Sequence, residues 1–179
     1  MKIQTQKNWK PLTHKHFKYQ LHRLIEEVAE LRAKNPDTYL NNTKTKLLER
    51  VLKSIFETVP ADPTAPDFRL GKTIGSKYKN WRRVKGGLPD RYRLFFLFNT
   101  TDRKIVYAWM NDEFSLRKEG SKTDAYNVFQ KFLDRGDIPA RYYEIIKTAQ
   151  TINPPGRRAV KCRKQVAIDN VISFRPRNN

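Results

Sequence analysis

The run Tyr92–Phe98, YRLFFLF, constrains this chain more than any other stretch of its sequence. Side chains alternate between the two faces of a strand, so even-numbered residues of the run face one way and odd-numbered residues the other. Apart from Arg93, both sets are apolar or aromatic, which is typical of a strand buried in the middle of a sheet. The run therefore predicts a core built around a central strand. It also leaves Arg93 as a charge that needs a partner or a ligand.

Further strands are predicted on both sides of this run. The candidates are Phe68–Thr73, Trp81–Lys85 and Lys104–Met110. They are joined by short turns, among them one rich in glycine and proline at residues 86–90 and another at residues 100–102. Short connections favour antiparallel pairing, because parallel strands need a long crossover. The sequence thus predicts an antiparallel sheet.

Two helices are predicted before the sheet. Apolar residues recur at helical spacing over His14–Lys34 and again from Leu47 to Phe56. The break between them at Asn35–Asp37 is short, so the helices are expected to pack antiparallel as a hairpin.

A third helix is predicted after the sheet, over Thr123–Arg135, with Gly136 as its C-cap, and a short helical segment over Tyr142–Ala149. Residues 153–179 carry seven Lys and Arg (157, 158, 161, 163, 164, 175 and 177) but only one acid, Asp169. This tail is interpreted as a flexible basic arm or as an added edge strand around NVISF. The order of elements predicts an α+β domain over residues 1–152 followed by the basic tail.

The charge balance indicates a polyanionic partner. The chain has 37 Lys and Arg against 18 Asp and Glu, a formal net charge of +19. Nucleic acid is favoured over an acidic membrane or protein, and over a basic surface that serves only solubility. Cys162 is the only cysteine, which excludes an internal disulfide and a cysteine metal cluster. No run reaches membrane-spanning length, so a cytoplasmic protein without a membrane partner is expected.

Positive charge is concentrated beside and inside the apolar run. Residues 72–93 contain eight Lys and Arg (72, 77, 79, 82, 83, 85, 91 and 93) and one acid, Asp90. Alternation places Arg83 and Lys85 on one face of their strand and Arg82 on the other. If Arg93 shares the first face, three cations converge there.

Two simpler interpretations of these charges stay open. A solvated edge hairpin would carry Lys and Arg merely to discourage aggregation. Arg93 would then need a structural ion pair, for which Asp112 and Glu113 are the candidates. Ligand or catalytic use of Arg93 is favoured, because its run is apolar on both faces.

Several motifs, in one order over residues 8–143, resemble the YhaV-type toxins of bacterial type II toxin–antitoxin systems. They are FRLGKTIGSKYKNWRRVKGGLPDRYRLFF, VYAWMNDEFSLR and TDAYNVFQKFLDRGDIP. The resemblance implies the RelE-like fold, an N-terminal helical hairpin packed on an antiparallel sheet and followed by a C-terminal helix. It also implies an endoribonuclease that cleaves mRNA, associates with the ribosome and inhibits translation. The implied partner is a PrlF-type, AbrB-like antitoxin, which would connect the toxin indirectly to operator DNA.

The resemblance also assigns site residues. Arg83 and Lys85 match the arginine and lysine of the family motif W-x-R-V-K. Arg93 matches the arginine of Y-R-L, which RelE-like enzymes place at the scissile phosphate. Tyr126, in DAY, resembles a tyrosine near the RelE site.

Cleavage of RNA needs a base for the 2′-hydroxyl and stabilisation of the phosphorane. Arginine suits the phosphorane but is a poor base. The base is therefore Lys85, whose cationic neighbours favour its neutral form, or a carboxylate of Asp112 or Glu113. Those acids have a structural alternative, starting a turn or pairing with Arg117. Tyr126 either stacks on a base or donates a proton, and its alternative is a place in the core.

Supporting contacts to RNA are predicted from the remaining cations, Lys72, Lys77, Lys79, Arg82, Arg91 and Arg117. The three histidines lie near the N-terminus, and surface positions on the first helix are expected for them. No metal site and no cofactor are predicted. Two other functions stay open: a non-catalytic protein that binds RNA or the ribosome, and a gyrase inhibitor like the related ParE proteins.

Overall fold

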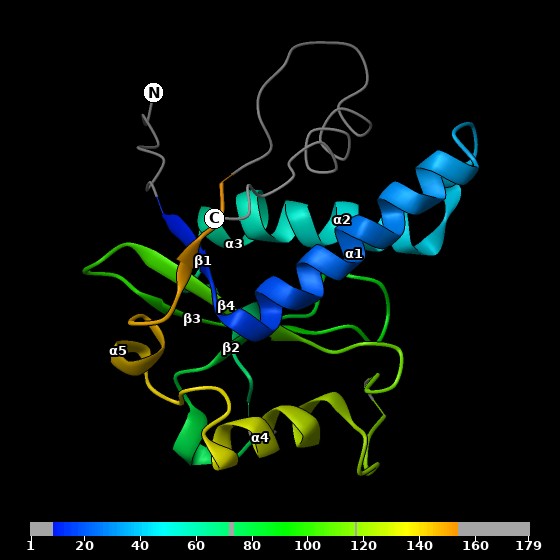
Figure 1. Ribbon diagram of the computed structural model, residues 1–179. Helices are drawn as coiled ribbons and strands as arrows, with labels where there is room; N and C mark the ends of the chain where they lie inside the picture. Colours follow the sequence, from blue (N-terminus) through cyan, green and yellow to red (C-terminus); the bar gives the residue numbers. More distant parts are fainter. Residues whose placement is uncertain (1–8, 72–73, 117, 154–179) are drawn as a thin grey trace.

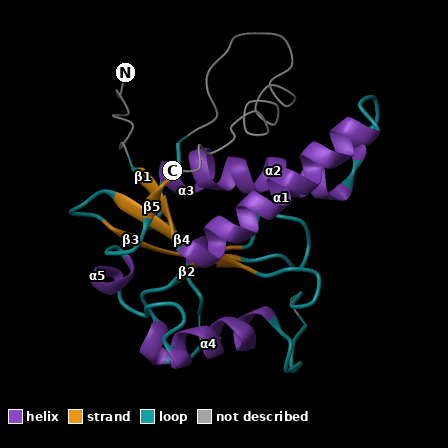
Figure 2. Cartoon of the chain, viewed as in Figure 1, coloured by secondary structure: helices purple, strands orange, loops and turns teal. Residues whose placement is uncertain are grey.

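The computed structural model describes residues 9–71, 74–116 and 118–153. Within these residues a single sheet lies between two helical layers (Figures 1 and 2). Helices α1 (Lys15–Lys34) and α2 (Thr43–Lys53) cover one face, and α4 (Ala125–Arg135) covers the other. The basic tail and its NVISF segment lie outside the described residues.

The sheet is mixed rather than antiparallel. Its strands, in spatial order, are β2 (Arg82–Val84), β3 (Leu94–Asn99), β4 (Lys104–Met110), β1 (Lys10–Thr13) and β5 (Gln150–Thr151). β1 runs parallel to β4, whereas every other pair is antiparallel. The predicted α+β class is confirmed, but the prediction of a wholly antiparallel sheet is wrong. The error came from β1, because four residues that include Pro11 carry too little pattern to be read as a strand.

The apolar run does form the central strand of the predicted hairpins, since β3 pairs with both β2 and β4. β3 begins at Leu94, so Arg93 lies directly before the strand and not inside it. The strand predicted over Phe68–Thr73 is absent from its described part. Pro66–Phe68 forms a 3-10 turn, Arg69 makes one bridge to Arg82, and Gly71 has a positive φ of 66° that leaves the extended conformation.

The predicted helical hairpin is confirmed, and Figure 1 shows α1 and α2 running in opposite directions. The buried residues of α1, Phe17, Leu21, Leu24 and Val28, recur at helical spacing and share a core with β3 and β4. α2 passes through a π-helical turn (Ser54–Thr58) into α3 (Val59–Ala61), and Tyr39–Asn41 forms a 3-10 turn between α1 and α2.

A second core lies between the sheet and α4. Phe129 stacks on Phe95 at 4.1 Å and on Trp109 at 5.9 Å between ring centroids. The helix begins after Asp124, whose Oδ1 accepts a hydrogen bond of 3.0 Å from the backbone N–H of Tyr126, and it ends at Gly136 with φ 77°. The predicted third helix and its C-cap are therefore confirmed. The short helix α5 covers only Tyr142–Ile145, and Ser76–Tyr78 forms another 3-10 turn.

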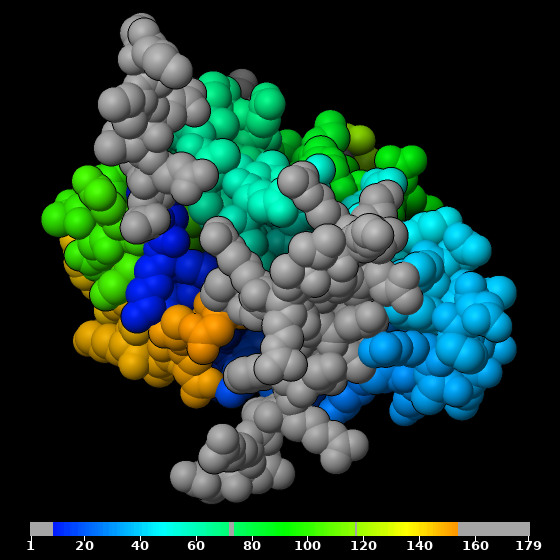
Figure 3. All heavy atoms as spheres, turned by 90° about the horizontal axis from the view of Figure 1, so that it is seen from above, coloured from blue at the N-terminus to red at the C-terminus, as the bar shows by residue number. Residues whose placement is uncertain are grey.

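The two ends of the described chain meet at one edge of the sheet. β5 pairs with β1, and the backbone N–H of Ile152 donates to the carbonyl of Pro11 at 3.2 Å. Figure 3 shows β1 in blue beside residues 150–153 in orange. Among the described helices, none has the length and apolar character needed to cross a bilayer.

Candidate active site

The β2–β3 hairpin places Arg83, Lys85 and Arg93 at neighbouring positions; we call these three residues the cationic face. Arg83 pairs with Phe95 in the ladder, and Val84 pairs with Leu94, which is the last pair. Lys85 directly follows β2 and Arg93 directly precedes β3, so both lie just beyond that end of the ladder. Phe95 belongs to the core against α4, which puts Arg83 on the α4 side of the sheet. Lys85 is exposed and follows β2 directly. The three residues therefore lie close to one end of the β2–β3 ladder, and the convergence of their side chains on one patch stays a prediction.

Arg83 is oriented by three acceptors that carry no negative charge. Its Nε donates to the hydroxyl of Tyr126 at 2.5 Å, and its Nη1 donates to the carbonyls of Asp67 (3.2 Å) and Arg69. Tyr126 is 4% exposed and packs edge-on against Phe95. The ring of Tyr126 therefore has the place in the core that was weighed as its alternative, and its hydroxyl accepts a hydrogen bond from Arg83.

Arg93 is an almost buried charged residue. The residue is 8% exposed, its Nη1 donates to the carbonyl of Tyr92 at 2.6 Å, and its Nε has no acceptor in the described chain. The structural alternative required an ion pair with Asp112 or Glu113. Among the described residues no carboxylate lies within ion-pair distance of Arg93. Burying an uncompensated charge is costly, and a bound anion would remove that cost.

Asn111 holds this end of the sheet together and was not singled out from the sequence. It is fully buried, and its Oδ1 accepts from the backbone N–H of Arg93 at 2.5 Å. Its Nδ2 donates to the carbonyl of Arg91 at 2.9 Å, and its own N–H donates to the carbonyl of Arg93 at 3.3 Å. Arg91 itself has a positive φ of 70°. The available signal was a polar residue directly after the apolar strand KIVYAWM.

The two candidate acids lie away from Arg83. Asp112 forms a turn, because its Oδ1 accepts from the backbone N–H groups of Phe114 and Ser115 at 3.1 and 3.0 Å. Glu113 is exposed. Both line a pocket together with residues of α1 and α2, on the sheet face opposite α4. The turn that was weighed as an alternative for Asp112 is therefore present.

The predicted RNA-contacting residues are distributed over both faces. Arg82 lies opposite Arg83, as alternation predicted, with its guanidinium 5.6 Å from the Phe98 ring centroid. Its burial, followed by the charge of Arg69, lowers the pKa of Arg82. Lys77 forms an exposed ion pair of 3.5 Å with Asp134, near the C-terminal end of α4. Lys79 and Arg91 are exposed, whereas Lys72 and Arg117 lie outside the described residues.

The expectation of surface histidines is wrong for His14. His14 is the N-cap of α1, is 2% exposed, and has no hydrogen-bond partner for its Nδ1 in the described chain. Burial, with the charges of His16 and Lys15, lowers the pKa of His14 to about 4. Residues 9–71, 74–116 and 118–153 contain no group of three or more His, Cys, Asp and Glu side chains that could hold a metal ion.

Comparison with known proteins matches the sequence of this chain to one family over most of its length. Residues 12–150 match the model of the YhaV toxin family, described as a toxin with endonuclease activity, of a toxin–antitoxin system. The ribonuclease toxin YhaV of Escherichia coli strain K12 is 43% identical over 143 residues, which cover 79% of this chain and 92% of the relative. Toxin YhaV of Escherichia coli O157:H7 matches with the same identity and coverage. No solved structure shows a significant match.

Proposed function

This chain belongs to the YhaV family of ribonuclease toxins, and we propose that its cationic face binds the scissile phosphate of messenger RNA. The protein acts as the endoribonuclease of a toxin–antitoxin system, with RNA as its substrate and an antitoxin as its partner. The RelE-like arrangement is part of the proposal. It is supported by a helical hairpin on one side of the sheet and α4 on the other.

The observation that carries the phosphate site is the charge of Arg93. An almost buried guanidinium without a described counter-ion is costly in the free protein, and a phosphate would compensate it. Arg83 supports this site from the neighbouring strand. Its backbone carbonyl partners orient the guanidinium without neutralising it, so that its charge stays available for the substrate.

The reaction can be written with the residues of the cationic face. A base takes the proton of the 2′-hydroxyl, the 2′-oxygen attacks phosphorus, and the bond to the 5′-oxygen breaks. The leaving 5′-oxygen receives a proton, so the products are a 2′,3′-cyclic phosphate and a 5′-hydroxyl. Arg83 and Arg93 stabilise the negative charge of the phosphorane. Lys85 is proposed as the base, since it follows β2 at the end of the ladder where Arg93 precedes β3, whereas Asp112 and Glu113 line a pocket on the opposite face of the sheet.

From the same chemistry we also propose that cleavage of RNA needs no metal ion. RNA supplies its own nucleophile, and two guanidinium groups supply the positive charge that a metal ion provides in other nucleases. Because ribosomes themselves need Mg²⁺, the test uses RNA free of ribosomes, and its cleavage is expected to continue in excess chelator at unchanged rate. Loss of cleavage in chelator, restored by a divalent cation, would contradict this part.

The proposed partners follow from family membership and from charge. Messenger RNA is cut at the ribosome, in the cytoplasm, and a PrlF-type, AbrB-like antitoxin covers the cationic face with acidic residues. That antitoxin would connect the toxin to its operator DNA. Cross-links that place the antitoxin only on the outer side of α1 and α2 would contradict its position.

The experiment compares one messenger RNA in a translating extract with the same RNA free of ribosomes. Cleavage that appears, or is much faster, in the extract supports action on the ribosome. Equal cleavage in both restricts the proposal to free RNA. Binding without any cut would instead support the non-catalytic alternative, and inhibition of gyrase supercoiling would support the ParE-like one.

A further inference from the structure

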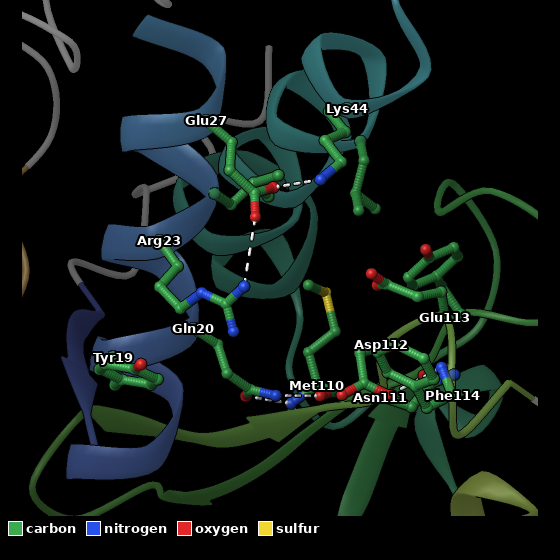
Figure 4. Close-up of a pocket in the computed structure, with 13 residues that line it drawn as sticks. Tyr19, Gln20, Arg23, Glu27, Lys44, Met110, Asn111, Asp112, Glu113 and Phe114 are labelled. Atoms are coloured by element: carbon green, nitrogen blue, oxygen red, sulfur yellow. Dashed lines mark hydrogen bonds and ion pairs between the residues drawn. The ribbon is translucent and has the colours of Figure 1, made fainter. Parts of the chain in front are cut away.

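The pocket that Asp112 and Glu113 line lies at the same end of the sheet as Arg93, on the α1–α2 side. It has a volume of 140 Å³ and is lined by residues of α1, α2 and the segment after β4 (Figure 4). Gln20 fixes α1 to the end of β4, because its amide exchanges two hydrogen bonds with the backbone of Met110, at 2.5 and 3.0 Å. The apolar part of the lining is supplied by Leu24, Leu47 and Met110. The walls of the recess therefore belong to elements that are fixed to each other.

Exposed aromatic side chains are concentrated at this pocket. The described chain exposes three large hydrophobic side chains, Tyr19 (65%), Phe114 (80%) and Tyr143 (69%), and the first two line the pocket. Figure 4 shows Tyr19 on the α1 side and Phe114 on the opposite side. Burial of a phenylalanine is stabilising, so a ligand that covers Phe114 and Tyr19 at the mouth of the pocket would gain this free energy.

Phe114 is presented by a turn that Asp112 closes. Oδ1 of Asp112 accepts from the backbone N–H of Phe114 at 3.1 Å, and from the N–H and hydroxyl of Ser115 at 3.0 and 2.7 Å. Ser115 is buried, which anchors the turn to the body of the protein. The phenyl ring is thereby held on the outside of a fixed turn, as a platform on which a flat ring can stack.

The polar groups of the pocket are divided between two walls. On the helical wall, Glu27 bridges Arg23 (3.4 Å) and Lys44 (2.7 Å). On the other wall, the carboxylate of Glu113 points toward the interior (Figure 4), and no described residue forms a hydrogen bond or ion pair with it. The cations of the helical wall are therefore compensated by Glu27, whereas the carboxylate of the other wall is available to accept hydrogen bonds from N–H groups.

The pocket is joined to the cationic face through Asn111. Asn111 lines the pocket, and its Oδ1 also accepts from the backbone N–H of Arg93. Tyr92, whose carbonyl accepts from the Arg93 guanidinium, lines the pocket as well. The recess and Arg93 therefore lie at the same end of the sheet, and an RNA strand held by its phosphate at Arg93 would pass around that end to place a nearby base in the recess.

We propose that this pocket receives one base of the RNA beside the scissile phosphate, stacked on Phe114 and hydrogen-bonded at its edge by Glu113. The inference rests on the proposed phosphate site and adds a specificity subsite to it. Single-stranded bases are recognised by stacking on aromatic side chains and by hydrogen bonds to their edges. A carboxylate accepts from exocyclic amino groups, and guanine offers two adjacent donors, N1–H and N2–H. Guanine is therefore favoured at this position, and uracil, which has no amino group, is disfavoured.

The pocket is small. Sites for drug-sized ligands have volumes of about 300–1,000 Å³, whereas this pocket offers 140 Å³. That volume holds one planar base, and equally one side chain of a protein partner. Binding of the antitoxin at Phe114 is accordingly an outcome that the test must be able to detect.

The test maps cut positions on one messenger RNA in a translating extract, for the parent and the variants Phe114→Ala and Glu113→Gln. Phe114→Ala should reduce kcat/KM by roughly tenfold or more, the range for loss of one stacked base, and should leave the melting temperature unchanged. Glu113→Gln should weaken the preference for amino-bearing bases at one position beside the cut. Tyr143→Ala is the matched control, an exposed aromatic outside the pocket, and should cut as the parent does.

Three results would overturn the subsite. Phe114→Ala could retain the parent's rate and cut positions, or it could lose antitoxin binding while cleavage is unchanged, which would make the pocket a protein-docking site. Glu113→Gln could slow cleavage equally at all sequences, which would identify Glu113 as the base of the reaction. Arg93→Ala, measured in parallel, separates the two proposals. An active Arg93→Ala contradicts the phosphate site, whereas unchanged cut positions in the pocket variants contradict only the subsite.

Discussion

The two arginines of the cationic face are held by neutral oxygens rather than by carboxylates. Arg83 donates to two backbone carbonyls and the Tyr126 hydroxyl, and Arg93 donates to the carbonyl of Tyr92. Such partners fix the direction of a guanidinium and leave its charge uncompensated. This arrangement suits a site that must stabilise negative charge appearing only during the reaction.

Arg83 and its neighbour Arg82 provide a matched pair for testing this organisation. Arg83→Ala should lose roughly 2–4 kcal/mol of transition-state stabilisation, the cost of removing one oriented donor. Arg82→Ala removes the same charge from the opposite face, where the guanidinium lies over Phe98, and should cost far less. The measurement is kcat/KM for cleavage of one RNA by both variants. Equal losses would mean that only overall charge matters.

His14 predicts a pH dependence of stability. Its pKa is about 4 in the folded protein, through burial and the charges of His16 and Lys15, against 6.5 for a free histidine. Between these values the unfolded chain binds a proton that the folded chain does not. The contribution of His14 is therefore fully present above pH 6.5 and is lost as the pH falls toward 4, by about 3 kcal/mol at most.

The measurement is the free energy of unfolding of the parent and of His14→Gln from pH 4 to pH 7. The stability of the parent should fall more steeply on acidification than that of the variant. His22→Gln, on the same helix, serves as the control and should keep the steeper slope. Parallel curves for the parent and His14→Gln would refute the prediction.

At the residue scale, the sequence was informative about charge and uninformative about contacts. Alternation identified Arg83 and Lys85 as one face, because the period of a strand does not depend on its neighbours. It could not identify Asn111, whose importance comes from hydrogen bonds to residues about twenty positions away. It also missed the burial of His14, whose ring lies against His16, which in turn contacts Phe132 of α4.

At the scale of elements, long periodic segments were predictable and short ones were not. α1, β4 and α4 each carry enough apolar residues at one period to identify them. β1 and β5 have four and two residues, and they become strands only because β4 offers a free edge to β1. The parallel pairing of β1 with β4, which makes the sheet mixed, could therefore not be predicted from the hydrophobic pattern of the sequence alone.

The end of α4 gives a test at this scale. Gly136 has φ 77°, a conformation that L-residues with a side chain adopt only at a cost, although no atom lies within 4 Å of an added Cβ. Gly136→Ala should therefore reduce the free energy of unfolding by about 1 kcal/mol through backbone strain. Gly86→Ala is the control, because its added Cβ is equally unobstructed and its φ is not in the positive region. Chemical denaturation measures both, and equal effects would show that strain is not the cause.

At the scale of the whole molecule, we expect the net charge of +19 and the oriented groups of the cationic face to have different roles. Overall charge attracts RNA from a distance and weakens with salt, whereas oriented groups act on one phosphate. We expect the seven cations of residues 153–179 to act in the first way, since none of them matches a motif of the family. This division makes the contribution of the tail separable from that of the site.

Deleting residues 154–179 should weaken binding to RNA or ribosomes and flatten its salt dependence. For each phosphate that the truncated protein no longer neutralises, the slope of log K against log salt should become shallower by about 0.7–0.9. Turnover at saturating substrate should persist, because Arg83, Lys85 and Arg93 remain. Affinity measured over a range of salt concentrations tests this. An unchanged slope, or a truncated protein that melts much earlier, would contradict it.

The most direct test of the central claim is Arg93→Met, measured for RNA cleavage and for thermal melting in the same preparation. If the almost buried charge of Arg93 serves the scissile phosphate, its removal should lower kcat/KM by roughly 100-fold or more. The melting temperature should stay the same or rise, because a buried charge without a described counter-ion no longer has to be accommodated. A variant that cleaves as the parent does, or one that loses activity only because it melts far below the parent, would contradict the account.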